Sequence, residues 1–241
     1  MMATFILVHG AWHGGWAWQE VAARLTENGH KVLTPDLPGH GQCSMPLQEM
    51  TMKAYVQSVV DLLDQQSEPV ILVGHSMSGA VISQAAEQRL DKVTKLVYVC
   101  AFLLGNSETV LDAMKKDEAG EFLPRLTFTE NQSGAQFDEA TLREVFYNDT
   151  PEERIQWARP RLITTQPTEP FGAPVHITNE RFGGIPRAYV KCMKDKILTP
   201  QAQQQMIDAF PCTQVVELDA DHAPFLSKPE ELSKAFLSME A

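Results

Sequence analysis

The sequence lacks the features that define several classes of protein. No apolar run approaches the roughly 20 residues that a membrane-spanning helix needs. Basic residues are the minority, with 20 Lys and Arg against 31 Asp and Glu. The resulting net charge of -11 argues against a nucleic-acid partner and against binding to an anionic membrane surface. The first residues run into an apolar segment without the basic and apolar regions of a secretory signal, so we expect a cytoplasmic protein.

Cysteine is scarce and widely spaced. The four cysteines are Cys43, Cys100, Cys192 and Cys212, and they lack the C-x-x-C spacing of zinc and redox sites. We therefore expect buried free thiols rather than disulfides or metal ligands. The Gly-rich loop at 10–15 also lacks the G-x-G-x-x-G order of a dinucleotide site. The sequence predicts no metal and no cofactor.

What the sequence does contain is an alternation of short apolar runs and amphipathic segments. The apolar runs predict strands at about 4–8, 31–35, 69–73, 95–100, 187–192 and 213–218. Helical spacing of apolar residues lies between them, for example at 51–65 and 199–209. This alternation is typical of βαβ units. We expect an α/β fold with a mainly parallel sheet of about six strands flanked by helices.

The alternation stops between about residues 103 and 185. That stretch carries charges, prolines and scattered aromatic residues, and it shows no strand alternation. An excursion of this length is either disordered or folded over the sheet, and its aromatic content favours the second. We expect one domain, 1–241, with its core at 1–102 and 186–241. A mostly helical cap, 103–185, is then inserted after the fourth strand.

The stretch 69–81 (PVILVGHSMSGAV) predicts a buried strand, a turn of small residues and a helix. Ser76 lies at the apex of that turn, where a strand-to-helix turn would present its hydroxyl as a nucleophile. The strict motif is G-x-S-x-G, and Ser78 stands where the second glycine is expected. Serine is small enough for the close backbone approach at that position. An ordinary turn with a surface serine is the alternative.

Two further reactive residue types follow other strands of the predicted sheet. The carboxyl ends of parallel strands meet at one edge, where function gathers. Asp195 follows the strand at 187–192 and His222 follows the last strand, which gives the chain order Ser, Asp, His. We therefore predict that Ser76, Asp195 and His222 are catalytic. Backbone N–H groups of Ala11 and Met77 are the predicted oxyanion hole.

Other titratable residues fit these roles less well. Asp219 and Asp221 are too close to His222 in the sequence to orient its ring. His9 is expected to form structural hydrogen bonds in a tight loop. His75 precedes the nucleophile and is expected to pack or to form hydrogen bonds beside it.

Four stretches of the core resemble the α/β-hydrolases, in the branch of plant methyl esterases and hydroxynitrile lyases. They are 7–16 (LVHGAWHGGW), 36–41 (DLPGHG), 74–79 (GHSMSG) and 221–224 (DHAP). The resemblance fades through the cap, where 165–167 (TQP) and 170–172 (PFG) are similar to bacterial carboxylesterases that cleave pyrethroid-type esters. The resemblance implies the α/β-hydrolase fold and cleavage of an ester.

Two positions differ from the lyases of this branch. Those lyases carry threonine at the position of Gly10 and lysine at the position of Ala223, and that lysine handles the cyanide leaving group. Lyase activity is therefore not expected. Relatives that use an aspartate nucleophile, such as dehalogenases and epoxide hydrolases, are excluded by Ser76.

We expect a cofactor-free serine carboxylesterase that hydrolyses a small to medium apolar or aryl ester through an acyl-enzyme. The alternative is a non-hydrolytic member of the fold, either a hydroxynitrile-lyase-like enzyme or a ligand receptor. The residues expected to line the substrate pocket are Gly10, Trp12, Phe128, Phe146, Trp157 and Phe171. A small-molecule ester is the expected partner, and the sequence leaves a monomer and a homodimer both open.

Overall fold

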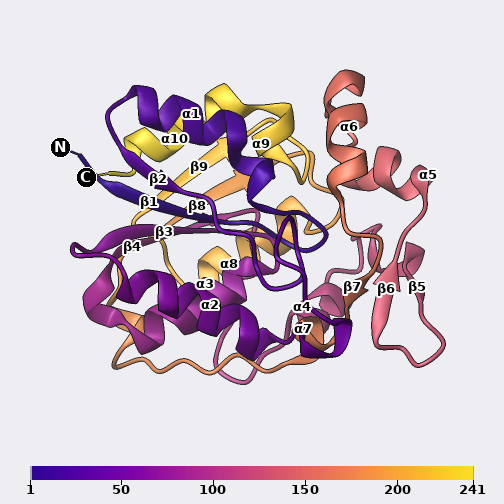
Figure 1. The fold of residues 1–241 in the computed structure, drawn as a ribbon, viewed down its shortest axis with the longest axis horizontal. Helices are drawn as coiled ribbons and strands as arrows, with labels where there is room; N and C mark the ends of the chain where they lie inside the picture. The colour runs from indigo at the N-terminus through magenta and orange to yellow at the C-terminus, as the bar shows by residue number, and fades with distance from the viewer. Residues whose placement is uncertain (1, 241) are drawn as a thin grey trace.

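Six parallel strands form the centre of the computed structural model, which describes residues 2–240 (Figure 1). The strands are β1 (Thr4–Val8), β2 (Lys31–Leu33), β3 (Val70–His75), β4 (Val93–Val99), β8 (Arg187–Cys192) and β9 (Gln214–Leu218). Their order in the sheet is β2-β1-β3-β4-β8-β9, and all neighbouring pairs run parallel. The predicted six-stranded parallel sheet is confirmed, with strand bounds close to the predicted ones.

The burial of the strands explains their sequence pattern. β3 lies in the middle of the sheet and is buried along its whole length, which requires a continuous apolar run instead of alternation. β9 lies at the edge of the sheet, and there Val215 is 41% exposed. Apolar runs therefore identify the central strands more sharply than the edge strand.

Helices cover both faces of the sheet. α1 (Gln19–Glu27) and α10 (Pro229–Ser238) pack together on one face, and α2 (Met52–Asp64) and α3 (Ser78–Gln88) pack together on the other (Figure 1). The remaining helical elements of the core are α8 (Pro200–Ala209), α9 (Pro224–Ser227), η1 (Gly15–Trp18), η2 (Leu47–Glu49) and η3 (Leu90–Lys92). Within the described residues, none of the helices has the length and apolar character needed to cross a bilayer.

Two of these helices begin at threonines that cap them. Thr51 Oγ1 accepts a hydrogen bond from the Ala54 N–H, and Thr199 Oγ1 accepts one from the Ala202 N–H, each at 3.2 Å. Such a bond satisfies one of the N–H groups that the first helical turn leaves without a partner. The helix bounds predicted at 51–65 and 199–209 agree closely with the structure.

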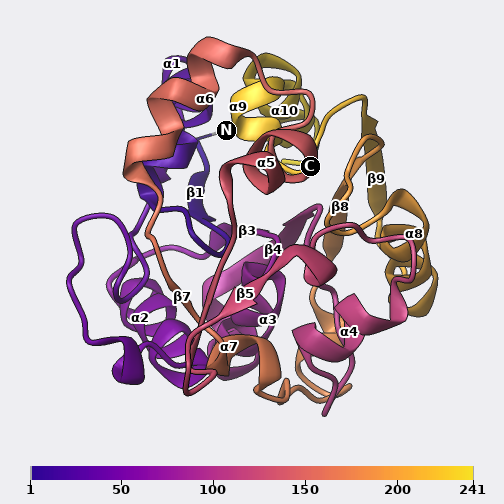
Figure 2. The ribbon, with the colours of Figure 1, turned by 90° about the vertical axis from the view of Figure 1, so that its right-hand side faces the viewer.

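Residues 103–185, called the cap segment below, leave the end of β4 and return to β8. Its elements are α4 (Val110–Lys116), η4 (Leu123–Arg125), β5 (Thr127–Phe128), β6 (Gly134–Gln136), α5 (Glu139–Thr141), η5 (Leu142–Phe146), α6 (Glu152–Ala158), η6 (Arg159–Arg161), β7 (Gln166–Pro167), α7 (Glu169–Gly172) and η7 (Phe182–Gly184). The views in Figures 1 and 2 show α5, α6 and β5–β7 beyond the carboxyl ends of the central strands. The short helices are joined by an antiparallel sheet, β5-β6-β7, that the sequence pattern did not predict.

Candidate active site

Ser76 lies directly after β3, in the turn that leads into α3. Its φ of +53° is in the left-handed region, which a non-glycine residue keeps only when its surroundings hold it there. The Ser76 N–H donates to the Val99 carbonyl at 3.2 Å, and the Ser76 carbonyl accepts from Gly79 and Phe102 at 3.0 Å each. A β-carbon on Gly79 would lie 2.5 Å from the Phe102 carbonyl oxygen, so this position has room only for glycine. The end of β4 therefore fixes the serine turn.

The structure brings Ser76, His222 and Asp195 into one line of hydrogen bonds. His222 Nε2 lies 2.9 Å from Ser76 Oγ, and His222 Nδ1 lies 2.7 Å from Asp195 Oδ2. A carboxylate oxygen accepts, so Nδ1 carries the proton and Nε2 offers its lone pair to the serine hydroxyl. Asp195 Oδ1 accepts the N–H groups of Ile197 and Leu198 at 2.8 and 3.0 Å, which fixes the carboxylate. This geometry can move a proton from the serine to the imidazole.

The neighbouring acid, Asp221, uses both of its carboxylate oxygens elsewhere. It accepts four hydrogen bonds, from Ala223 N (3.1 Å), Ser227 Oγ (2.8 Å), Asp149 N (3.0 Å) and Thr150 Oγ1 (2.7 Å). Burial raises the pKa of Asp221, and the hydrogen bonds from Thr150 and Ser227 oppose that shift. Asp221 thus ties the loop that carries His222 to the cap segment.

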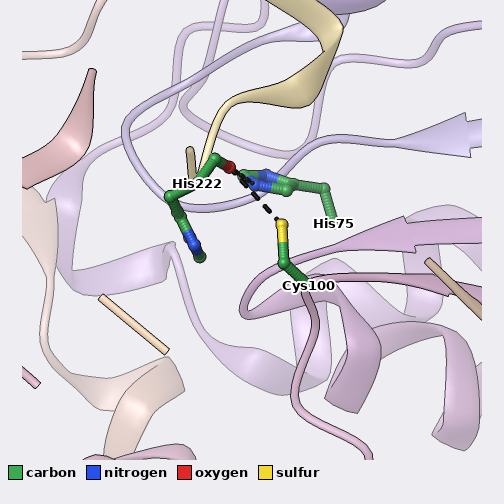
Figure 3. A group of neighbouring side chains, drawn as sticks. All are labelled: His75, Cys100 and His222. Carbon is green, nitrogen blue, oxygen red and sulfur yellow. Dashed lines mark hydrogen bonds between the residues drawn. The ribbon is translucent and has the colours of Figure 1, made fainter. Parts of the chain in front are cut away.

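The backbone of His222 is held from the side of the sheet (Figure 3). Its carbonyl oxygen accepts from His75 Nε2 at 2.7 Å and, more weakly, from Cys100 Sγ at 3.5 Å. Burial raises the pKa of the Cys100 thiol well above its ordinary value, so the S–H keeps its proton and can donate it to that carbonyl. His75, expected to pack beside the nucleophile, is thus a donor to the histidine loop.

The same three side chains have the composition of a metal site. Potential ligand atoms of His75, Cys100 and His222 lie within 4.8 Å of one another. Both ring nitrogens of His222 already bond to Ser76 and Asp195, and a protonated buried thiol is a poor ligand because the thiolate is the form that binds metals. The group fits the positioning of the His222 loop better than it fits a metal.

The loop after β1, residues 9–13, lies beside the serine turn, and side chains hold its carbonyl groups. The His9 carbonyl accepts from Ser78 Oγ, the Gly10 carbonyl from His9 Nδ1 at 2.8 Å, and the Ala11 carbonyl from His13 Nδ1 at 2.9 Å. A β-carbon on Gly10 would lie 2.8 Å from Ser76 Cβ, so the loop approaches the serine closely.

Two backbone N–H groups beside the serine remain available. Within residues 2–240, no hydrogen bond uses the N–H of Ala11 or the N–H of Met77. Both belong to residues next to the serine turn, Ala11 in the loop after β1 and Met77 directly after Ser76. Two such donors could stabilise negative charge on an oxygen bound at the serine.

Five aromatic side chains, called the aromatic cluster below, cover this site: Trp12, Phe122, Phe137, Phe146 and Phe171. Ring centroids of the four phenylalanines lie 5.2–6.3 Å from that of Trp12. The Phe146 ring also lies 5.6 Å from the His222 ring. The cluster therefore packs against the histidine beside Ser76, and the serine itself is only 7% exposed.

The structure places two of the expected pocket residues elsewhere. Phe128 is 52% exposed, because β5 is an outer strand of the small sheet and exposes both of its residues. Trp157 packs against Trp16, with ring centroids 5.5 Å apart, and against the Arg161 guanidinium. In their place the cluster contains Phe122 and Phe137, which the irregular sequence of the cap segment could not assign to a face.

Four buried histidines lie around the site, and burial favours their neutral forms. Burial is the main cause that lowers the pKa of His9, His40 and His75, and it lowers that of His13 to about 3. The hydrogen bonds fit the neutral forms of two of them. His9 Nδ1–H donates to the Gly10 carbonyl while Nε2 accepts from the Leu37 N–H, and His13 Nε2 lies 2.8 Å from the Tyr147 hydroxyl. A second proton on His9 would sit on Nε2 and break the bond from the Leu37 N–H, which cannot act as an acceptor.

These histidines predict a loss of stability in mild acid. Below about pH 6.5 these histidines are protonated in the unfolded chain but not in the folded protein, so the unfolded state binds more protons. The free energy of unfolding therefore decreases as the pH is lowered. A histidine with a strongly lowered pKa loses about 1 kcal/mol between pH 6.5 and 5.5, so His9, His13 and His75 predict roughly 3 kcal/mol. The raised pKa of Asp221 acts in the opposite direction.

Urea unfolding at about pH 7.5, 6.5 and 5.5 measures this loss. His176 is exposed, and His176→Gln is the control that should leave the loss unchanged. A free energy of unfolding that stays constant down to pH 5.5 would contradict the assignment of neutral buried rings.

The chain resembles known proteins over nearly its whole length. Residues 5–235 match the alpha/beta hydrolase family. The chain is 35% identical over 247 residues to a pyrethroid hydrolase of Sphingobium wenxiniae, covering 97% of this chain and 86% of that protein. It is 31% identical over 254 residues to the putative methylesterase 14, chloroplastic, of Arabidopsis thaliana, covering 99% of this chain and 72% of that protein. Across four such plant relatives, it spans 55% to 72% of their length.

A solved structure shows the same fold. The pyrethroid hydrolase from Sphingobium faniae JZ-2 superposes with a TM-score of 0.87 at 33% identity, covering 99% of this chain and 97% of that one. These matches confirm the resemblance to the branch of plant methyl esterases and bacterial pyrethroid hydrolases. The protein belongs to the alpha/beta hydrolase family.

Proposed function

We propose that the protein is a serine carboxylesterase that hydrolyses a small to medium apolar or aryl ester through an acyl-enzyme. The observation that carries the proposal is the line of hydrogen bonds from Ser76 Oγ through His222 to Asp195, at 2.9 and 2.7 Å. Relatives named methylesterase and pyrethroid hydrolase support the cleavage of esters.

The reaction follows from the positions of the protons. Ser76 Oγ attacks the ester carbonyl carbon while its proton passes to His222 Nε2. Asp195, bonded to Nδ1–H, stabilises the imidazolium that forms. His222 then gives the proton to the alcohol oxygen as the C–O bond breaks. Water repeats these steps on the acyl-enzyme, which releases the acid and restores Ser76.

The tetrahedral intermediate carries its negative charge on the former carbonyl oxygen. The N–H groups of Ala11 and Met77 are the proposed donors to that oxygen, and neither is used in a hydrogen bond within residues 2–240. Donors fixed before the reaction stabilise this charge without reorganisation, which makes them a large contribution to catalysis.

The aromatic cluster supports the choice of substrate. Its rings would contact the acyl or alcohol group of an ester bound at Ser76, and they favour apolar groups over sugars or nucleotides. A hollow of about 320 Å³ is lined by Trp12 and Phe137 of the cluster, by apolar residues of the cap segment, and by the charged residues Asp138, Glu139 and Arg159. We propose that the substrate enters from this hollow, because its lining includes Trp12, which directly follows Ala11.

Ser76→Ala is expected to abolish ester turnover, with a loss on the order of 10⁶ in kcat, because the nucleophile is removed. Hydrolysis of p-nitrophenyl esters measures the loss, and a fluorophosphonate should label Ser76. The matched control is Ser233→Ala, a buried serine whose hydroxyl donates to the Pro229 carbonyl within α10. Labelling of another residue, or substantial turnover by Ser76→Ala, would refute the proposed nucleophile.

The two buried acids should separate in a kinetic comparison. Asp195→Asn is expected to lower kcat by roughly 10⁴, since it no longer fixes the histidine tautomer. Asp221→Asn should lower kcat far less but reduce stability by about 1–3 kcal/mol, because it leaves buried donors without an acceptor. Turnover and urea unfolding of both variants test this, and the reverse ranking of kcat would make Asp221 the acid.

Esters of increasing acyl or alcohol size test the role of the aromatic cluster. Each methylene that enters an apolar pocket contributes about 0.8 kcal/mol, so kcat/KM should rise roughly fourfold per methylene until the pocket is full. Phe137→Ala should shift the acyl length at which the rise stops, whereas the exposed Phe128→Ala should not. Equal kcat/KM values along both an acyl and an alcohol series would rule out selection by the cluster.

A further inference from the structure

Trp12 is the junction between the core and the cap segment. It directly follows Ala11, the proposed oxyanion donor, and its φ is +62°. Its N–H donates to Gln166 Oε1 at 2.9 Å, and its carbonyl accepts from the Ile163 N–H at 3.0 Å. The cap segment thus holds both backbone polar groups of the residue beside the oxyanion donor.

The Gln166 side chain is itself fixed. Gln166 is completely buried in β7, where its backbone pairs with Ala135 of β6. Its Oε1 also faces His40 Nε2 at 2.9 Å. One amide therefore links the loop after β1, the loop after β2 and the cap segment.

The conformation of Trp12 depends on such links. A bulky residue with positive φ is strained, and it keeps that conformation only where its surroundings impose it. The Trp12 N–H lies in the peptide after Ala11, and the Ala11 N–H, which must point at the oxyanion, lies in the adjacent peptide of the same loop. If the acceptor for the Trp12 N–H is removed, the loop can relax and turn the Ala11 N–H away from the substrate. An error of about 1 Å in such a site can cost a factor of 10² in rate.

We propose that Gln166 is a positioning residue for ester hydrolysis, which sets the direction of the Ala11 N–H by accepting a hydrogen bond from Trp12. The inference rests on the proposed function. The proposed role connects the loop after β1 with the cap segment, which lie far apart in the sequence. The segment proposed to select the substrate would then also fix the oxyanion hole.

The role predicts a specific pattern of losses. The oxyanion hole acts on the transition state, so its displacement lowers kcat and leaves substrate binding nearly unchanged. A trifluoromethyl ketone reports the same effect at equilibrium. Ser76 Oγ adds to its carbonyl carbon, the proton moves to His222, and the carbonyl oxygen becomes an oxyanion. The corresponding methyl ketone binds the same site without forming this stable adduct.

The experiment compares variants of Gln166 in the full chain. Gln166→Met removes the acceptor at nearly constant volume, Gln166→Asn withdraws it by one methylene, and Gln166→Glu keeps an acceptor oxygen. The control is Gln136→Met, the same substitution in the same small sheet, where the side chain bonds to Thr165 Oγ1 instead of to the loop. Each variant is assayed for turnover of p-nitrophenyl esters and for inhibition by benzyl trifluoromethyl ketone and benzyl methyl ketone.

Gln166→Met and Gln166→Asn should lose about 10- to 100-fold in kcat and in affinity for the trifluoromethyl ketone. Their KM and their affinity for the methyl ketone should stay within about threefold of wild type. Gln166→Glu should keep most of the wild-type kcat and ketone affinity, because it keeps an acceptor oxygen. Gln136→Met should lose little of either. Gln166→Asn decides the test if Gln166→Met does not fold.

Wild-type kcat in the folded Gln166→Met and Gln166→Asn variants would overturn the inference and leave the proposed function intact. Equal losses of affinity for the trifluoromethyl ketone and the methyl ketone would do the same. A wild-type protein that neither hydrolyses the esters nor binds the trifluoromethyl ketone would overturn both.

Discussion

The hydrogen bond between His222 Nδ1 and Asp195 Oδ2 is the interaction on which the rest of the site depends. Both side chains are fully buried, so neither can exchange its partner for water at low cost. The surrounding structure holds each end of this bond separately. The N–H groups of Ile197 and Leu198 fix the carboxylate, and His75 fixes the backbone of the histidine. Ser76 therefore meets a histidine whose position and tautomer are set before any substrate arrives.

Backbone strain is concentrated at the same edge of the sheet. Three non-glycine residues with positive φ follow three neighbouring strands: Trp12 after β1, Ser76 after β3 and Cys100 after β4. Hydrogen bonds hold the backbone of Trp12 and Ser76 on both sides, and the Cys100 N–H donates to the Val190 carbonyl. Strained residues persist where several contacts impose one conformation. The cap segment supplies the contacts at Trp12, whereas neighbouring strands of the parallel sheet supply contacts at Ser76 and Cys100.

The sequence could predict the central sheet and the meeting of Ser76, Asp195 and His222, because both depend on simple patterns. Buried parallel strands are continuous apolar runs, and their carboxyl ends share one edge. The cap segment has no comparable pattern, since its strands are only two or three residues long. The contact between Trp12 and Gln166 joins a backbone group to a side chain 154 residues away, and no periodicity reports such a bond. For the same reason, the substrate pocket predicted from the sequence includes Phe128 and omits Phe137.

Ser78, which stands where the G-x-S-x-G motif has its second glycine, shows what the glycines of that motif are for. These glycines mark points where backbones crowd, and the crowding here falls on Gly74 and Gly79. A β-carbon on Gly74 would lie 2.7 Å from the Ser78 carbonyl oxygen, and one on Gly79 would lie 2.5 Å from that of Phe102. The Ser78 side chain instead reaches the His9 carbonyl, in the loop that carries the Ala11 N–H. The substitution therefore adds a hydrogen bond between the serine turn and the loop after β1. The two loops that would surround an ester carbonyl are thus joined through a residue that the strict motif would exclude.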